Sequence, residues 1–142
     1  MLVPRVSAVS AGPEHVCALR TDGTVACWGL NFDGRATPPG GSFTSVAAGD
    51  RFSCGIKTDR KVACWGANKF GQATPPGDLF TTVGAGQGFA CGIKTDRTVA
   101  CWGWGADGGT TPPPGSFASL SVGWTHACGI KTDAGTVFLR GH

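Results

Sequence analysis

The chain has 142 residues, 41% of them hydrophobic and 15% charged, a composition that indicates a folded protein and argues against an intrinsically disordered one. Its net charge of +3 comes from scattered Lys and Arg rather than from a basic patch, so we expect no nucleic-acid partner. No apolar stretch approaches the ~18–20 residues that cross a bilayer, and we expect no membrane insertion.

The cysteines recur with a fixed period. Cys17, Cys54, Cys91 and Cys128 are each 37 residues apart, and Cys27, Cys64 and Cys101 repeat this spacing. A constant period of this length indicates a repeat architecture, in which neighbouring units bury a shared core. We therefore expect a single domain over residues 1–142, with repeats of about 6–42, 43–79 and 80–116 and a partial fourth at 117–142.

Each unit begins with a strand-like segment: VSAVSAG, FTSVAAG, FTTVGAG or FASLSVG. A hairpin follows, HVCALRTDGTVACWG in the first copy, and the first three copies continue with a Gly-containing loop and a Pro-rich segment such as ATPPG. Short β-prone runs between turn signals predict a small antiparallel sheet of up to four strands. Small residues, as from Ser45 to Ala48, suit the crowded centre of a radial array, and the prolines after Thr74 belong at its outer edge.

The register of the hairpin follows from its turn. A three-residue turn at Thr21-Asp22-Gly23 makes the numbers of facing residues sum to 44. Cys17 then faces Cys27, Leu19 faces Val25, Ala18 faces Ala26 and Val16 faces Trp28. Both faces of the sheet are largely apolar, so each unit must be covered on both sides by its neighbours.

Facing cysteines can reach the Cα separation of about 4.4–6.8 Å that a disulfide needs. We predict the bridges Cys17–Cys27, Cys54–Cys64 and Cys91–Cys101. Buried reduced thiols are one alternative, and zinc shared between units is another, although the C-x9-C spacing differs from that of zinc knuckles. Cys128 has Phe138 and Leu139 where its partner would fall, so we expect a buried free thiol, or else a link to another chain.

Disulfides persist only in an oxidising compartment, so the cysteine pairs predict an extracellular protein, secreted or at the cell surface. The opening segment MLVPRVSAVSAG has neither the apolar core nor the cleavage site of an export signal. The cysteines, and not the N-terminus, therefore carry the prediction of the compartment.

The pattern C-G-I-x-T-D-x-x-V-x-C-W-G-x-N-x-x-G-Q-x-x-P-P resembles the short-repeat branch of the regulator of chromosome condensation family over nearly the whole chain. Members with such short units include a propeller-type β-lactamase inhibitory protein and the ectodomains of Crinkly-type receptor kinases. The resemblance implies an all-β fold, a β-propeller that is commonly seven-bladed and acts by protein recognition. It specifies a fold far better than a function, because one scaffold carries unrelated activities.

Three complete units and a partial fourth are too few for a seven-bladed ring. A propeller that stays open exposes apolar faces and strand edges. We therefore expect two chains to close one ring of seven or eight blades, as a homo-oligomer. A four-bladed monomer, a capped open stack and a fragment of a longer product are the alternatives.

Comparison of the copies separates constant from variable loops. The TDG and TDR turns and the PPG segments barely change, whereas the loop before the hairpin and the loop after it differ between units. Alternate connections of an up-and-down sheet emerge at opposite ends, so the two variable loops should share one rim. We predict that this rim binds a partner, through aromatic and charged residues typical of interfaces: Phe32, Asp50, Arg51, Phe70, Trp104, Trp124 and His126. Drift of unconstrained surface loops would give the same variation.

Other recurring residues are expected to be structural. Aromatic residues that recur at fixed positions should lie in the core: Phe43, Phe80, Phe117, Trp28, Trp65 and Trp102. Asn31 and Asn68 should hydrogen-bond the backbone of their loops. The carboxylates of Asp22, Asp59, Asp96 and Asp133 should serve turns on separate units, not an acid–base pair.

Nothing in the sequence indicates catalysis. The three histidines form no metal-binding pattern, and no nucleophile elbow or phosphate loop is present. We expect a secreted, non-catalytic binding scaffold for a protein partner, with no cofactor and no metal. A lectin-like propeller and a self-assembling structural protein are the alternatives.

Overall fold

The computed structural model describes residues 5–104, 112, 114–133 and 135–140. The regular secondary structure of these residues consists of β-strands alone. The strands are β1 (Val6–Ala11), β2 (His15–Arg20), β3 (Val25–Gly29), β4 (Phe43–Ala48), β5 (Phe52–Lys57), β6 (Val62–Gly66), β7 (Phe80–Ala85), β8 (Phe89–Lys94), β9 (Val99–Gly103), β10 (Phe117–Val122), β11 (Ala127–Lys131) and β12 (Thr136–Arg140). Among the described residues there is no helix long and apolar enough to cross a membrane.

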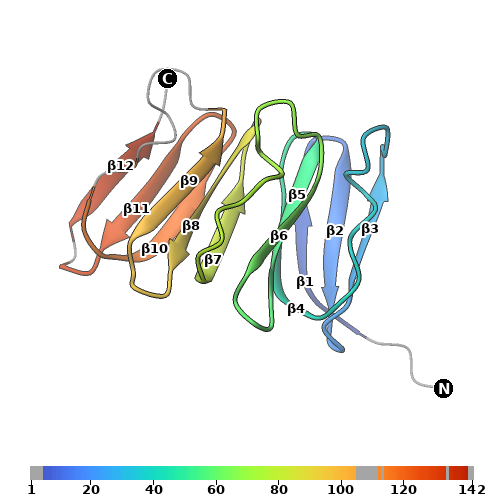
Figure 1. The fold of residues 1–142 in the computed structure, drawn as a ribbon, viewed down its shortest axis with the longest axis horizontal. Coiled ribbons are helices and arrows are strands. Elements are labelled where there is room, and N and C mark those ends of the chain that lie inside the picture. Colours follow the sequence, from blue (N-terminus) through green and yellow to red (C-terminus); the bar gives the residue numbers. More distant parts are fainter. Residues whose placement is uncertain (1–4, 105–111, 113, 134, 141–142) are drawn as a thin grey trace.

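The strands form four antiparallel sheets, ordered β1-β2-β3, β4-β5-β6, β7-β8-β9 and β10-β11-β12 in the described residues. Figure 1 shows them side by side in a row, from β1–β3 at one end to β10–β12 at the other. The first strands β1, β4, β7 and β10 contact one another along the row, as expected for the inner strands of a radial array. The row is open, so the four-bladed closed monomer is wrong for the described residues.

The predicted register of the hairpins is confirmed. Cys17 faces Cys27, Leu19 faces Val25 and Val16 faces Trp28, and the second and third sheets repeat the pattern. In the turn, Asp22 Oδ1 accepts the backbone N–H of Thr24 at 2.9 Å. The equivalent aspartates do the same for the second residue after them, which confirms that these carboxylates belong to turns.

The fourth strand that we allowed for at the outer edge is not formed in the second unit. Thr74 N donates to Gly71 O at 3.0 Å in a turn, and the following Pro75 and Pro76 have no N–H to donate to a ladder. An isolated bridge between Lys61 and Leu79 is what pairs this segment with the sheet. The sheets therefore have three strands, and β3, β6, β9 and β12 lie at their outer edges.

The three predicted disulfides are present: Cys17–Cys27, Cys54–Cys64 and Cys91–Cys101. Their Cα atoms lie 4.0–4.1 Å apart, slightly closer than expected. The reason is the register: Arg20 N donates to Thr24 O, which makes the cysteine pair a non-hydrogen-bonded pair, where facing strands approach most closely. Cys128 is free, as expected, and lies opposite Phe138. It is half-buried and not buried as expected, because no described sheet covers its face of the fourth sheet.

Adjacent sheets bury one repeated kind of interface. The cysteine face of the second sheet, with Ile56 2% exposed, packs against Phe80 and Trp102 of the third. The first interface combines the same positions, and in the third Phe117 packs with Cys91 and Ile93. Phe43, Phe80 and Phe117 are buried, as predicted, and so are Trp65 and Trp102. The prediction for Trp28 is wrong: it is 55% exposed, because it lies on the outward face of the first sheet, which no described sheet covers.

Glycines permit the close contact of the inner strands. A Cβ added to Gly12, Gly49 or Gly86 would lie 2.5–2.7 Å from the carbonyl oxygen of the equivalent glycine in the next sheet. No side chain tolerates such a contact with backbone. The spacing of the sheets at this end is therefore set by glycine.

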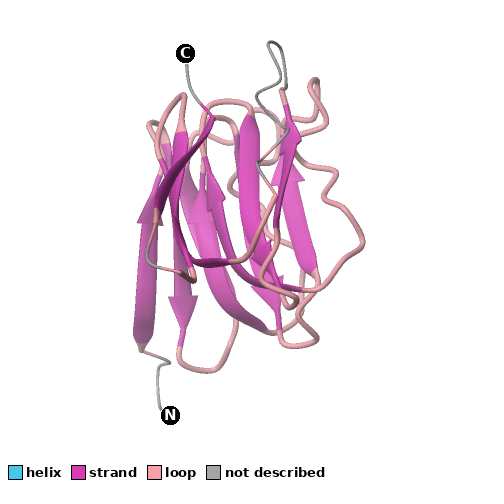
Figure 2. Cartoon of the chain, turned by 90° about the vertical axis from the view of Figure 1, so that its left-hand side faces the viewer, coloured by secondary structure: helices cyan, strands magenta, loops and turns pink. Residues whose placement is uncertain are grey.

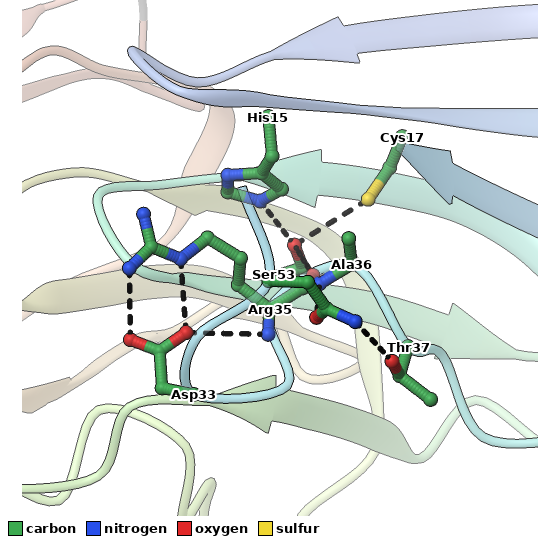
Figure 3. A network of polar contacts seen from close by, with 8 residues as sticks. His15, Cys17, Asp33, Arg35, Ala36, Thr37 and Ser53 are labelled. Carbon is green, nitrogen blue, oxygen red and sulfur yellow. Dashed lines mark hydrogen bonds and ion pairs between the residues drawn. The ribbon is translucent and has the colours of Figure 1, made fainter. Parts of the chain in front are cut away.

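The junction of the first two sheets contains a polar cluster, drawn in Figure 3. Ser53 Oγ donates to Arg35 O at 3.1 Å and lies 2.6 Å from His15 Nε2. Because the serine has given its only hydrogen to Arg35, the neutral His15 must donate through Nε2. Burial, and after it the positive charge of Arg35, hold the pKa of His15 below its ordinary value of 6.5.

We expect Gly49→Ala to lower the free energy of unfolding by about 1–3 kcal/mol, because it forces apart two packed sheets. Urea denaturation measures the change. Gly77→Ala is the matched control, since a Cβ there meets nothing within 4 Å, and its effect should stay within about 0.5 kcal/mol. Equal effects of the two substitutions would contradict this role of Gly49.

The disulfides predict that one thiol per chain reacts with iodoacetamide in denaturant before reduction, and that seven react after it. Each bridge closes a loop with a sequence separation of 10, so its reduction should lower the free energy of unfolding by about 2–3 kcal/mol. Mass spectrometry of non-reduced peptides checks the pairing. Seven reactive thiols before reduction would establish the reduced-thiol alternative instead.

His15 should make stability depend on pH. As the pH falls below 6.5, the unfolded chain binds a proton that the folded chain excludes, so the free energy of unfolding decreases until the pH passes the folded pKa. His15→Phe, which copies the buried Phe52 and Phe89 at equivalent positions, should remove this slope. His126→Phe makes the same change at the equivalent, exposed position of the fourth unit. This control variant should retain the pH dependence that His15 produces. Denaturation series between pH 4 and 8 would contradict the prediction if the His15→Phe slope matched that of the unsubstituted chain.

Candidate functional site

In the first three units the two variable loops, as far as the structure describes them, lie at the same end of the molecule. One backbone hydrogen bond joins them in each of the first three units: Leu30 N to Glu14 O at 2.9 Å, Ala67 N to Arg51 O at 2.8 Å and Trp104 N to Gly88 O at 2.7 Å. We call this end the variable rim; it comprises residues 12–14, 49–51, 86–88 and 123–126 with 30–36, 67–73 and Trp104. In Figure 2 the loops gather at the two ends of the strands.

The constant turns lie at the opposite end and connect neighbouring sheets. Phe43 N donates to Gly23 O at 2.7 Å, and Phe80 and Phe117 repeat this bond to Arg60 and Arg97 at 2.8 Å. Each turn therefore fixes the start of the next inner strand. This geometry explains why these turns barely vary between copies.

Side chains within the rim loops hold the loops in shape. Asn31 Oδ1 accepts Ala36 N at 2.8 Å, and Asn31 Nδ2 donates to Thr37 Oγ1 at 2.8 Å; Asn68 makes the same pair of contacts. The structural role predicted for both asparagines is confirmed. Arg35 donates to both carboxylate oxygens of Asp33, at 2.9 and 3.0 Å. Although burial acts the other way, these bonds and the charge of Arg35 keep the pKa of Asp33 below its ordinary value.

A groove of about 380 Å³ lies on the variable rim between the second and third sheets. Its lining includes Asp50, Arg51, Phe70, Gln72, Gln87 and Trp104. Four of the seven predicted partner-binding residues are therefore brought together, from three different loops. We call this feature the rim groove.

Two aromatic rings form one wall of the rim groove. The Phe70 and Trp104 rings lie 6.1 Å apart at 39°, and Lys69 Nζ lies 5.9 Å from the centre of the Phe70 ring. Gly88 lies beneath them, with a φ of +76°, and a Cβ there would come within 3.3 Å of Phe70. A larger residue than glycine would therefore push the aromatic wall outward.

Backbone contacts between sheets position the polar side of the groove. Asp50 N donates to Gly86 O at 3.0 Å, and Gln87 N donates to Trp124 O at 2.8 Å. Arg51 has a φ of +65°, the left-handed conformation that its equivalent Gly88 also adopts. The stacking of the sheets, as well as the conformation of the loop, therefore places the neighbouring charged residues Asp50 and Arg51.

The remaining predicted residues lie elsewhere on the rim. Trp124, 47% exposed, shares with Asp50 a second hollow of about 330 Å³ at the ends of the inner strands. Phe32 is 88% exposed on the first unit, and His126 is exposed on the fourth. Neither lines these two hollows.

Gln72 is a contributor that the sequence analysis missed. It is 3% exposed; its Oε1 accepts Phe70 N at 2.8 Å, and its carbonyl accepts Trp102 Nε1 at 3.1 Å. It thereby connects the aromatic wall to the core between the sheets. The sequence did contain a signal for Gln72: it follows Gly71 as Arg35 follows Gly34, so a polar residue recurs at this position of the loop.

The described residues hold no group of three or more His, Cys, Asp or Glu side chains that could bind a metal ion. The aspartates of the four hairpin turns bond the turn backbone, and Cys128 is the free thiol among cysteines that otherwise form bridges. The rim groove presents aromatic, amide and charged groups.

A family model described as the regulator of chromosome condensation (RCC1) repeat matches residues 6–35 and 43–72. No curated protein matches the chain. Among solved structures, the chain is similar to the CRINKLY WD40 ectodomain of the Arabidopsis thaliana receptor kinase ACR4, with 33% identity and a TM-score of 0.78 over 95% of this chain and 49% of that one. The ectodomain of the Physcomitrella patens receptor kinase CR4 gives 30% identity and a TM-score of 0.82, over 96% and 41%.

Prp20p of Saccharomyces cerevisiae shares the fold, with a TM-score of 0.78 at 14% identity over 93% of this chain and 44% of that one. The chain spans less than half the length of each of these three structures. The two segments that match the repeat model, 6–35 and 43–72, each contain the three strands of one sheet. Residues 6–35 and 43–72 therefore match repeats of the regulator of chromosome condensation family, and the antiparallel sheets have the blade fold of the β-propellers that the chain resembles.

Proposed function

We propose that this chain is an extracellular, non-catalytic scaffold that recognises a protein partner through the variable rim, with the rim groove at the centre of the contact. The observation that carries the proposal is the convergence of Asp50, Arg51, Phe70 and Trp104 on one groove. An aromatic wall beside charged groups is the composition of interface hot spots.

The size and chemistry of the rim groove suit one projecting side chain of a partner. Its volume of about 380 Å³ is that of a small pocket. The rings of Phe70 and Trp104 would contact an apolar or aromatic group, and Arg51, Asp50 and Gln87 would bond the backbone beside it. The surrounding rim, including Trp124 and Phe32, would supply the periphery of the interface.

The disulfides support the extracellular setting. Three bridges in one small chain persist where thiols are not kept reduced. The two plant proteins that the chain resembles at 30% identity or more are described as ectodomains of receptor kinases. Both lines point to the same compartment.

The fold itself supports protein recognition. The solved structures that share it include yeast RCC1 (Prp20) bound to Kap60 and Prp20p, described together with its binding to Gsp1p and histones. For this chain, the differences between copies favour a single asymmetric protein partner over a sugar. A lectin would repeat its site between blades, whereas the Phe70–Trp104 pair corresponds to Asp33 and Ala67 one unit earlier.

The test begins with a photo-crosslinking residue at position 70, applied to the extracellular proteins of the source organism, and the same residue at Leu79 beside the constant turns as control. A protein captured at position 70 alone is then purified. Trp104→Ala should weaken its binding at least tenfold, about 1.4 kcal/mol, because the substitution removes half of the aromatic wall. Leu79→Ala, an exposed apolar truncation, should change binding less than twofold.

Binding that survives Trp104→Ala within twofold, or that Leu79→Ala weakens equally, would contradict the role of the rim groove. A glycan array separates the lectin alternative: a sugar that competes with the captured protein, and whose own binding depends on Trp104, would replace the protein-partner proposal. Far-ultraviolet circular dichroism of each variant verifies that the sheets remain folded.

A further inference from the structure

The first sheet presents an uncovered apolar face at one end of the row. Val6, Val9 and Trp28 are 54%, 62% and 55% exposed. Their equivalents in the second sheet, Phe43, Val46 and Trp65, pack against the first. We call the face formed by Val6, Val9 and Trp28 the leading face.

The fourth sheet presents the opposite face at the other end. Ile130 is 46% exposed, whereas the equivalent Ile56 and Ile93 are 2% and 3% exposed. A hollow of about 240 Å³ there is lined by residues that include Cys128 and Ile130. We call the face around Cys128 and Ile130 the trailing face.

The two end faces are the two halves of one interface. In each of the three internal junctions, the cysteine face of one sheet receives the leading-type face of the next. Trp65, for example, packs on the first sheet beside Phe43, with ring centres 6.0 Å apart. The trailing face carries the receiving positions of this interface, and the leading face carries the inserted ones.

A glycine on the trailing face agrees with this reading. A Cβ on Gly86 would lie 2.5 Å from Gly123 O of the next sheet, but a Cβ on Gly123 would meet only His126 of its own sheet, at 3.3 Å. Within the described residues, nothing fills the place that a following sheet would take. The carbonyl that would come next in the series is that of Gly12.

We propose that a second copy of this chain docks head to tail on the first, leading face on trailing face, and that two copies close one ring through two equal contacts. The chain already contains this kind of contact three times, so a second copy offers a face of the type that the sheets pack against within one chain. The chain also spans 41–49% of the receptor ectodomains that it resembles, so two copies supply about the length of one. The inference is independent of the proposed partner at the variable rim, which remains accessible in the ring.

Sedimentation velocity of the 142-residue chain should give the mass of two chains. Trp28→Ser, which removes the main inserted side chain, should give single chains. Gly123→Ala should do the same, because within one copy its Cβ requires only a small shift of the exposed His126 ring, whereas in the ring it collides with Gly12 O of the other copy. Leu79→Ser, an equally simple apolar-to-polar change on the constant end, should remain a pair. Disulfide mapping and circular dichroism confirm that each variant is folded.

Cys128 gives a second readout. In the ring it lies under Trp28 of the second copy, so its alkylation by iodoacetamide should be at least tenfold slower in the paired chain than in the Trp28→Ser variant. Single chains for the unsubstituted protein, pairs that persist in folded Trp28→Ser, or open chains of many copies would each overturn the proposal. Loss of pairing with intact binding of the captured protein would leave the proposed function standing.

Discussion

Each three-stranded sheet presents apolar side chains on both faces, and this constraint governs the rest of the structure. A sheet so short cannot bury either face within itself, so every sheet needs a neighbour on each side. The repeated solution places Trp65 or Trp102 with a phenylalanine on the cysteine face of the preceding sheet. Disulfides hold that face together from within, because each one joins the two strands of a hairpin at their closest approach.

The same stacking creates the rim groove. Phe70 belongs to the second unit and Trp104 to the third, so their contact exists only because the two sheets are packed at a fixed distance. Glycines at the inner strands set that distance. Gln72 bonds both Trp102 in the core and the backbone of Phe70, and so fixes the loop that carries Phe70 relative to the core. Backbone bonds between sheets occur at both ends of the blades: at the constant turns, and at Asp50 and Gln87 on the variable rim. The side chains of the rim groove are therefore carried by a backbone that the stacking holds in place.

The hairpins could be predicted in detail because turn length and strand pairing determine the register by arithmetic, and facing cysteines then follow. The buried phenylalanines followed from their recurrence. Recurrence failed for Trp28, since burial depends on whether a neighbouring sheet is present and not on the residue. It failed also for the fourth strand, where the prolines left too few donors for a ladder. The grouping of Asp50, Arg51, Phe70 and Trp104 was foreseen only as a shared rim, because the distances between loops of different blades come from the stacking.

Departures from the repeat mark the positions where this chain has individual properties. The second sheet has Ser53 where the first and third have Val16 and Ala90, and the first has His15 where they have phenylalanine; together these replacements create one polar junction in an otherwise apolar series. Burial and the charge of Arg35 oppose protonation of His15, so in acid this histidine is less favourable than the phenylalanine found at the equivalent positions. The junction of the first two sheets is therefore the one expected to lose stability as the pH falls. It joins the first sheet, whose leading face is the exposed one, to the remainder of the row.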